Sequence, residues 1–152
     1  MRKLVIGFVA TLFSLQAADS TTPLFWNNAD MAKLNKELAG KIDPVRHLGS
    51  TRPTDSVLIA HRDGPSEAEI HEKDADFILM QDGEGTILVG GTLLESRVER
   101  PSELRGKPGT GGKMYPMKAG DMLYVPANTV HQFLVAPGKS FTAVIVKITP
   151  VK

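Results

Sequence analysis

The stretch Gly64–Gly83 reads GPSEAEIHEKDADFILMQDG, and the interpretation of the whole chain starts from it. Glu69 and His71 lie two residues apart, so on a β-strand their side chains point to the same face. Asp76 follows at the start of the apolar run FILM, which is typical of a buried strand. Asp82-Gly83 favours a tight hairpin turn, after which a second strand, TILVGGTLLE, is expected to return. Two carboxylates and one imidazole inside a β-structure indicate the beginnings of a metal site.

A second stretch, Gly120–Val135, reads GDMLYVPANTVHQFLV and carries another imidazole. His131 comes just after a Pro-Ala-Asn turn and just before an apolar run. Its turn signal is independent of the first stretch, and His131 is the residue that would complete the site.

Together the two stretches resemble the two motifs of the cupin superfamily, which are small β-barrels of the jelly-roll type. The first motif carries His-x-His, then Glu, then Gly at fixed spacing. His71 stands at the second His and Gly83 at the Gly, whereas Glu69 replaces the first His and Asp76 replaces the Glu. The spacing agrees closely, and the identity of the ligands agrees less well.

The second motif carries Gly, Pro-x-Gly, His and Asn. Gly120, Pro126 and His131 match it in register. Asn128 stands where the second Gly belongs, which is tolerable because Asn accepts left-handed backbone angles better than most residues. Val135 stands where the Asn belongs.

The resemblance implies one divalent metal ion held by Glu69, His71 and His131. Asp76 is either a fourth ligand or a neighbour that orients one, since aspartate is one methylene shorter than the usual glutamate. Two imidazoles with one or two carboxylates suit Fe, Mn, Zn or Ni. The structural alternative is that the acidic segment around Glu69 is only a solvated strand edge.

Residues 1–18 have the pattern of a secretory signal peptide: Arg2 and Lys3, an apolar run, then small residues. We therefore expect a periplasmic or secreted protein that has no membrane segment after cleavage near Ala18. The alternative is a buried N-terminal helix or a retained anchor.

Charge and cysteine content narrow the classes of partner. Without Arg2 and Lys3 the chain has 16 basic and 17 acidic residues, a net charge of about −1. This balance gives no electrostatic reason to expect nucleic acid as a partner. The chain contains no cysteine, so neither disulfides nor thiolate ligands are available.

The remaining chain divides into a helical extension over residues 19–55 and an all-β domain over residues 56–152. We expect a short helix at 30–39, capped by Asp30, packed outside a single-domain jelly-roll barrel; a partner-binding helix is the alternative. Strands are expected at 57–62, 67–71, 76–81, 85–95, 113–117, 121–125, 130–135 and 140–148. Residues 96–113 are expected to form a loop in which Arg105 and Glu103 pair; the alternative is that these two residues belong to a lid or substrate clamp. His47 is expected in a solvated loop.

Two classes of function remain open. One is a metal-dependent enzyme, most plausibly a dioxygenase, with isomerase or lyase chemistry next. The other is a non-catalytic cupin that binds a small molecule, with a structural metal or none. The pocket would be lined by Met80, Tyr124, Phe133, Arg62 and His61, and the pattern does not decide whether Arg62 or His61 points inward. Homodimer formation is left open.

Overall fold

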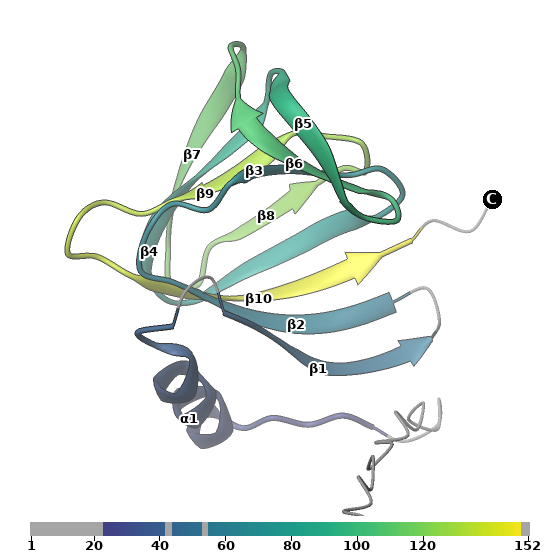
Figure 1. Ribbon diagram of the computed structural model, residues 1–152. Helices are drawn as coiled ribbons and strands as arrows, with labels where there is room; N and C mark the ends of the chain where they lie inside the picture. Colours follow the sequence, from purple (N-terminus) through teal and green to yellow (C-terminus); the bar gives the residue numbers. More distant parts are fainter. Residues whose placement is uncertain (1–22, 42–43, 53–54, 150–152) are drawn as a thin grey trace, which may run out of the picture.

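The computed structural model describes residues 23–41, 44–52 and 55–149, in which one helix precedes ten strands (Figure 1). The helix is α1 (Asn28–Leu38). The strands are β1 (Val45–Arg52), β2 (Asp55–Arg62), β3 (Ala68–His71), β4 (Ala75–Gly90), β5 (Leu93–Arg100), β6 (Glu103–Pro108), β7 (Gly112–Lys118), β8 (Met122–Val125), β9 (His131–Leu134) and β10 (Phe141–Ile148). The signal peptide expected at residues 1–18 lies outside the described residues. None of the described helices is long and apolar enough to cross a bilayer.

The strands form two antiparallel layers that share β4. Sheet A has the order β1-β2-β10-β4-β8, and sheet B has the order β5-β6-β3-β9-β4-β7. The two layers curve over a common apolar core, and the all-β jelly-roll prediction is confirmed (Figure 1). The buried core side chains are Leu58, Ala60, Ile78, Met80, Ile87, Met117, Val125, Phe133, Val135, Phe141, Ala143 and Ile145.

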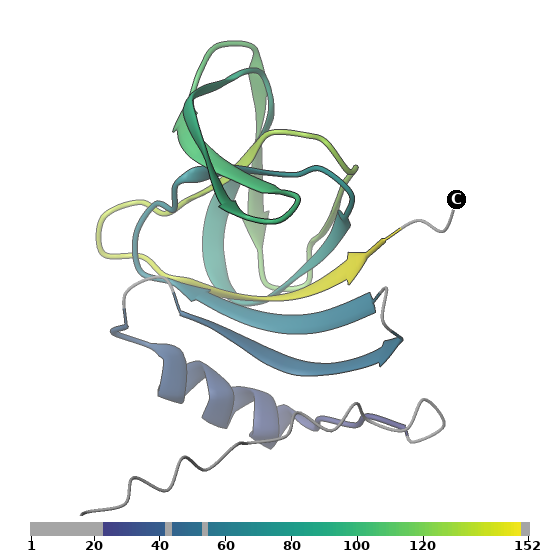
Figure 2. The same cartoon turned by 45° about the vertical axis from the view of Figure 1, so that its right-hand side comes forward.

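Helix α1 lies on the outside of the barrel, beneath β1 and β2, as expected (Figure 2). It begins two residues earlier than predicted because Asn27, rather than Asp30, is the N-cap. The Asn27 side chain accepts hydrogen bonds from the backbone of Ala29 and Asp30, and Asp30 accepts one from Asn27 in return. Asn35 fixes the helix to the barrel by donating to Asp82.

The hairpin predicted at Asp82-Gly83 is wrong, because β4 runs through this point for 16 residues. Gly83 has a φ of 75°, and a register shift at the neighbouring Thr142–Ala143 step bends the strand. The first half of β4 pairs with β10 and β8, and the second half finds new partners in β7 and β9. The chain therefore changes sheet instead of reversing direction.

Two segments expected outside the barrel sheets belong to them. Residues 45–52, placed in the helical extension, form β1, an edge strand paired with β2, and the exposed His47 lies on it. Residues 96–113, expected as a loop, contain most of the β5–β6 hairpin. Neither segment shows a regular apolar alternation, because β1 is at an edge and β5 is almost entirely exposed. Backbone pairing rather than side-chain burial defines both.

Gly83 provides a test of the bend in β4. A Cβ atom added there would lie 2.1 Å from the carbonyl oxygen of Ser140, whereas one added at Gly138 meets nothing within 4 Å. Both glycines have a φ of 75°, so Gly138→Ala is a matched control. We expect Gly138→Ala to cost about 1–2 kcal/mol of unfolding free energy, and Gly83→Ala about 2–5 kcal/mol because the backbone clash adds to it.

Urea denaturation of the two variants measures both costs. Equal losses at the two positions would contradict the close approach of β4 to the turn before β10.

Candidate metal centre

Two rows of inward-facing polar residues meet across the barrel. In sheet B, Glu69 on β3 pairs with Arg105 on β6 and with His131 on β9. In sheet A, Lys147 on β10 pairs with Asp76 on β4. The strand pairing thus brings residues that are far apart in sequence onto two facing surfaces.

Each of two carboxylates contacts both imidazoles. Glu69 Oε1 lies 3.3 Å from His131 Nε2 and 3.6 Å from His71 Nε2. Asp76 Oδ2 lies 3.5 Å and 3.4 Å from the same two nitrogens. All four side chains are buried. The four sequence-predicted ligands therefore come together, and Glu69, His71 and His131 form a group able to hold a metal ion.

The Nε2 atoms of His71 and His131 are the clearest sign of a ligand. Both are buried and have no hydrogen-bond partner. The other ring nitrogens face acceptors: His131 Nδ1 lies 3.2 Å from the carbonyl oxygen of Thr129, and His71 Nδ1 lies 3.4 Å from Glu103 Oε2. A proton on Nδ1 leaves the Nε2 lone pair directed at the centre, which is how metal-binding histidines are oriented.

The spacing of these atoms fits a first-row metal ion. Neighbouring ligands with bonds of about 2.1 Å lie roughly 3.0–3.4 Å apart in octahedral or tetrahedral sites. The four carboxylate–imidazole distances of 3.3–3.6 Å are at or slightly above this range. They are longer than ordinary hydrogen bonds. The ligand atoms of Glu69, His71 and His131 all lie within 4.8 Å of one another, so they would draw closer together around an ion.

A second layer of ion pairs holds the carboxylates. Arg105 donates to Glu69 Oε2 at 2.8 Å and to Glu103 Oε1 at 2.9 Å. Arg100 donates to Glu103 Oε2 at 2.7 Å, and Lys147 donates to Asp76 Oδ1 at 2.8 Å. The predicted Arg105–Glu103 pair is thus present, but it faces the site from a strand and does not stabilise a loop.

Without a metal, the four central groups favour their charged forms, and a bound ion would displace the Nε2 proton of each imidazole. Burial disfavours the imidazolium, but the carboxylates of Asp76 and Glu69 outweigh it and raise the pKa of His131 to about 9. The pKa of His71 is raised by the same competition. Burial likewise opposes ionisation of Glu69 and Asp76, but the two imidazoles keep both carboxyl pKa values below their usual range.

Sequence reasoning missed Lys147, which is the principal partner of Asp76. In the strand FTAVIVKI it is the single charged residue, and its side chain is only 12% exposed. A lysine in the same phase as the buried Ala143 and Ile145 was a usable signal. This sequence signal does not identify Asp76 as the partner of Lys147, because the pairing of β10 with β4 must be known first.

The predicted pocket residues divide into three environments. Met80 and Phe133 are in the core, and Arg62 lies over the Phe133 ring at 5.3 Å. His61 is on the opposite face of β2, where it contacts Thr142 and Asp63. Tyr124 is 55% exposed, so its expected place inside the barrel is wrong. Leu123 and Val125 turn inward on β8, and the two-residue period puts Tyr124 outside.

Comparison with known proteins identifies the fold through structure alone. The sequence matches no protein-family model and no curated protein. A hydroquinone 1,2-dioxygenase from Sphingomonas, solved with 4-hydroxybenzoate bound, is similar with a TM-score of 0.55 and 14% identity over 76% of this chain and 72% of that one. A predicted oxalate decarboxylase from Thermotoga maritima is similar with a TM-score of 0.52 and 17% identity, over 70% and 79% of the two chains.

The Cnp3 cupin domain of Schizosaccharomyces pombe has a TM-score of 0.52 and 9% identity. That match covers 70% of this chain and 64% of the Cnp3 chain, so it spans less than two-thirds of the latter. At these identities the three likenesses concern the fold.

The ion-pair layer can be tested by removing Arg105. Its loss leaves Glu69 and Glu103 buried without their shared cation, and breaking a buried pair on one side costs about 3–5 kcal/mol. Arg97, paired with Glu67 at about half exposure, is the matched control. We expect Arg105→Met to lower the unfolding free energy of the metal-free protein by about 3 kcal/mol, and Arg97→Met by less than about 1 kcal/mol.

Chemical denaturation of both variants measures the two losses of unfolding free energy. If Arg105→Met proved no more costly than Arg97→Met, the two glutamates would not depend on Arg105 for burial.

Proposed function

Because this chain has the cupin fold, we propose that it binds one divalent metal ion through Glu69, His71 and His131 and binds or transforms a small organic molecule there. The observation that carries the proposal is the pair of buried Nε2 atoms that have no hydrogen-bond partner. A buried polar atom left unsatisfied costs about 1–3 kcal/mol. Two such atoms facing one point between two carboxylates are explained by a cation bound there.

Asp76 is placed to serve as the fourth ligand or as the residue beside it. Its two oxygens have separate tasks: Oδ1 accepts from Lys147, and Oδ2 faces the imidazoles. The ammonium therefore fixes the rotation of the carboxylate whether or not Oδ2 binds the ion. Arg105 does the same for Glu69 by holding Oε2, which leaves Oε1 toward the imidazoles.

Within this proposal, the finer assignment is a metal-dependent dioxygenase. When bound, the ion would supply Lewis acidity and, if it is iron, dioxygen chemistry of the kind supported by two histidines and one carboxylate. The donor set also suits Mn, Zn and Ni. The likeness to hydroquinone 1,2-dioxygenase favours this assignment through fold alone.

The second candidate function is a non-catalytic small-molecule-binding cupin with a structural metal or none. It is favoured by the state of the carboxylates: Glu69, Glu103 and Asp76 are each engaged by an arginine or a lysine. A general base must be able to accept a proton from the substrate, and the pKa values of Glu69 and Asp76 are both held below their usual range.

The metal site is tested by elemental analysis and metal titration. We expect about one divalent ion per chain in wild-type protein purified without a tag. His131→Ala should weaken binding about 100-fold or more, because even residues behind the ligands change affinity 10–100-fold. His61, whose ring contacts Thr142 and Asp63 on the opposite face of β2, provides the control, and folded His61→Ala should bind metal like the wild type.

Unchanged affinity in His131→Ala, with its fold verified by circular dichroism, would contradict the site. A redox-active metal in the purified protein would favour the oxygenase. A folded wild-type protein that takes up no metal would favour the metal-free binder.

Export remains part of the proposal and rests on residues 1–18 alone. We expect the protein from its native host to begin near Ala18 or Asp19 and to be found outside the cytoplasm. N-terminal sequencing of the isolated protein checks this, and an intact Met1 on soluble cytosolic protein would refute it.

A further inference from the structure

A cavity of about 170 Å³ opens beside the proposed metal centre, with His71 and Lys147 in its wall. Its other lining residues include Ser56, Leu58, Arg100 and Glu103. Two larger hollows, of about 430 and 460 Å³, are lined by none of the four central residues. Of these three hollows, the small cavity is the one that has a proposed metal ligand, His71, in its wall.

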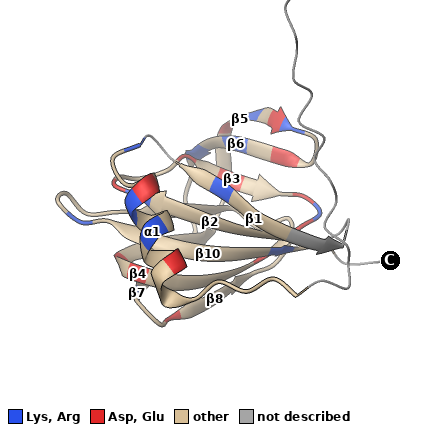
Figure 3. Ribbon diagram, turned by 90° about the horizontal axis from the view of Figure 1, so that it is seen from below, with Lys and Arg blue, Asp and Glu red and all other residues tan. Residues whose placement is uncertain are grey.

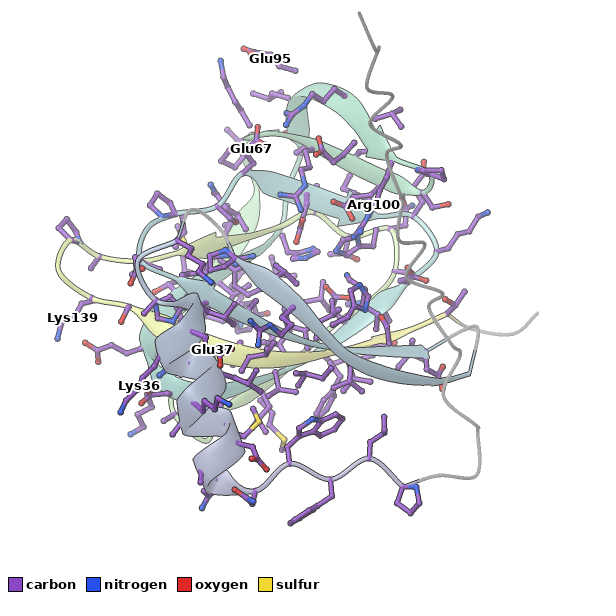
Figure 4. All side chains as sticks on the ribbon, turned by 60° about the horizontal axis from the view of Figure 1, so that its bottom comes forward. Lys36, Glu37, Glu67, Glu95, Arg100 and Lys139 are labelled. Atoms are coloured by element: carbon purple, nitrogen blue, oxygen red, sulfur yellow. The ribbon has the colours of Figure 1, made fainter. Side chains whose placement is uncertain are left out.

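The wall of this cavity is built from paired strands. Ser56 on β2 is the direct neighbour of Lys147 on β10, which is in turn the neighbour of Asp76 on β4. The three residues form one row across sheet A that leads from the cavity to the centre. Arg100, labelled in Figure 4, lies across the barrel from Lys139.

When the two imidazoles are counted as neutral, as metal ligands must be, the other charged side chains around the centre are balanced. Among the described residues, the ion pairs there join three carboxylates to three permanent cations: Glu69, Asp76 and Glu103 with Arg100, Arg105 and Lys147. With neutral imidazoles, a divalent ion adds two positive charges that these pairs do not compensate. Counting Asp74 at the cavity wall still leaves one positive charge in excess. An anionic molecule would remove it.

Lys147 is positioned to contact such an anion. Its ammonium has three N–H donors, of which one is directed to Asp76 Oδ1. The residue lines the cavity, while its side chain is only 12% exposed. A charge-assisted hydrogen bond made there is shielded from water and is stronger than one at the surface.

The volume limits the size of the molecule. The cavity has a volume of about 170 Å³. It is smaller than the 300–1,000 Å³ that is usual for drug-sized ligands.

We propose that this cavity binds a small monocarboxylate, with Lys147 holding the carboxylate near the metal ligands His71 and Asp76. The inference rests on the proposed metal site and names the class of molecule that the site takes. Residues of both signs are interspersed over the face that carries α1, so the face does not present one sign of charge (Figure 3).

Propionate and propionamide are matched probes, because they have the same number of heavy atoms and differ in charge. Cobalt-loaded protein of verified metal content is titrated with each, and binding is followed by the visible spectrum of the cobalt and by calorimetry. We expect propionate to bind about 10-fold or more tightly than propionamide.

Three variants separate the contributions of charge, space and surface. Lys147→Met should weaken propionate binding about 10-fold or more. Ser56→Leu fills the cavity without changing a charge and should also weaken propionate binding. Lys139→Met removes a lysine paired with Glu84 on the exposed surface and should change nothing.

The outcomes distinguish the two proposals. If the wild type takes up no metal, the proposed function fails. If metal is bound but propionate and propionamide bind equally, the cavity inference is wrong and the metal site stands. The cavity inference is equally wrong if metal-loaded Lys147→Met binds propionate like the wild type. If Lys147→Met loses its metal, Ser56→Leu decides, and unchanged propionate binding in it overturns the inference.

Discussion

The burial of two carboxylates against two imidazoles is the constraint on which the rest of the structure depends. An unpaired buried charge is too costly to keep inside a small domain. Glu69 and Asp76 are retained there because each is held on one side by a cation and faced on the other by His71 and His131. Arg105 and Lys147 thus leave one oxygen of each carboxylate directed toward the centre.

That arrangement requires both sheets of the jelly roll. Glu69, His71 and His131 come from sheet B, and Asp76 comes from sheet A. The long strand β4 makes this possible, since it lies in sheet A at Asp76 and in sheet B beyond Gly83. A hairpin at Asp82-Gly83 would have kept both halves in one layer. Gly83, where the sequence predicts a turn, is therefore the point at which β4 passes from one sheet to the other.

The sequence was sufficient for the fold class and for the convergence of the four candidate ligands. Their spacing and the apolar runs around them are local features, and Asn128 adopts the left-handed angle, with a φ of 58°, that its place in the motif requires. The long-range features were missed for a physical reason. β1 and the β5–β6 hairpin are defined by backbone pairing at sheet edges, which leaves little trace in side-chain pattern. The Lys147–Asp76 pair depends on a strand order that local sequence does not encode.

The central claim is that one ion occupies the point between Glu69, His71, Asp76 and His131. The most direct measurement is anomalous X-ray scattering from crystals of the cobalt-loaded protein, with data collected on both sides of the cobalt absorption edge. The account predicts one strong anomalous peak in the barrel, within bonding distance of the Nε2 atoms of both His71 and His131. Anomalous peaks at surface sites alone would contradict the account. So would a protein that takes up no cobalt at saturating metal and whose crystals show no peak.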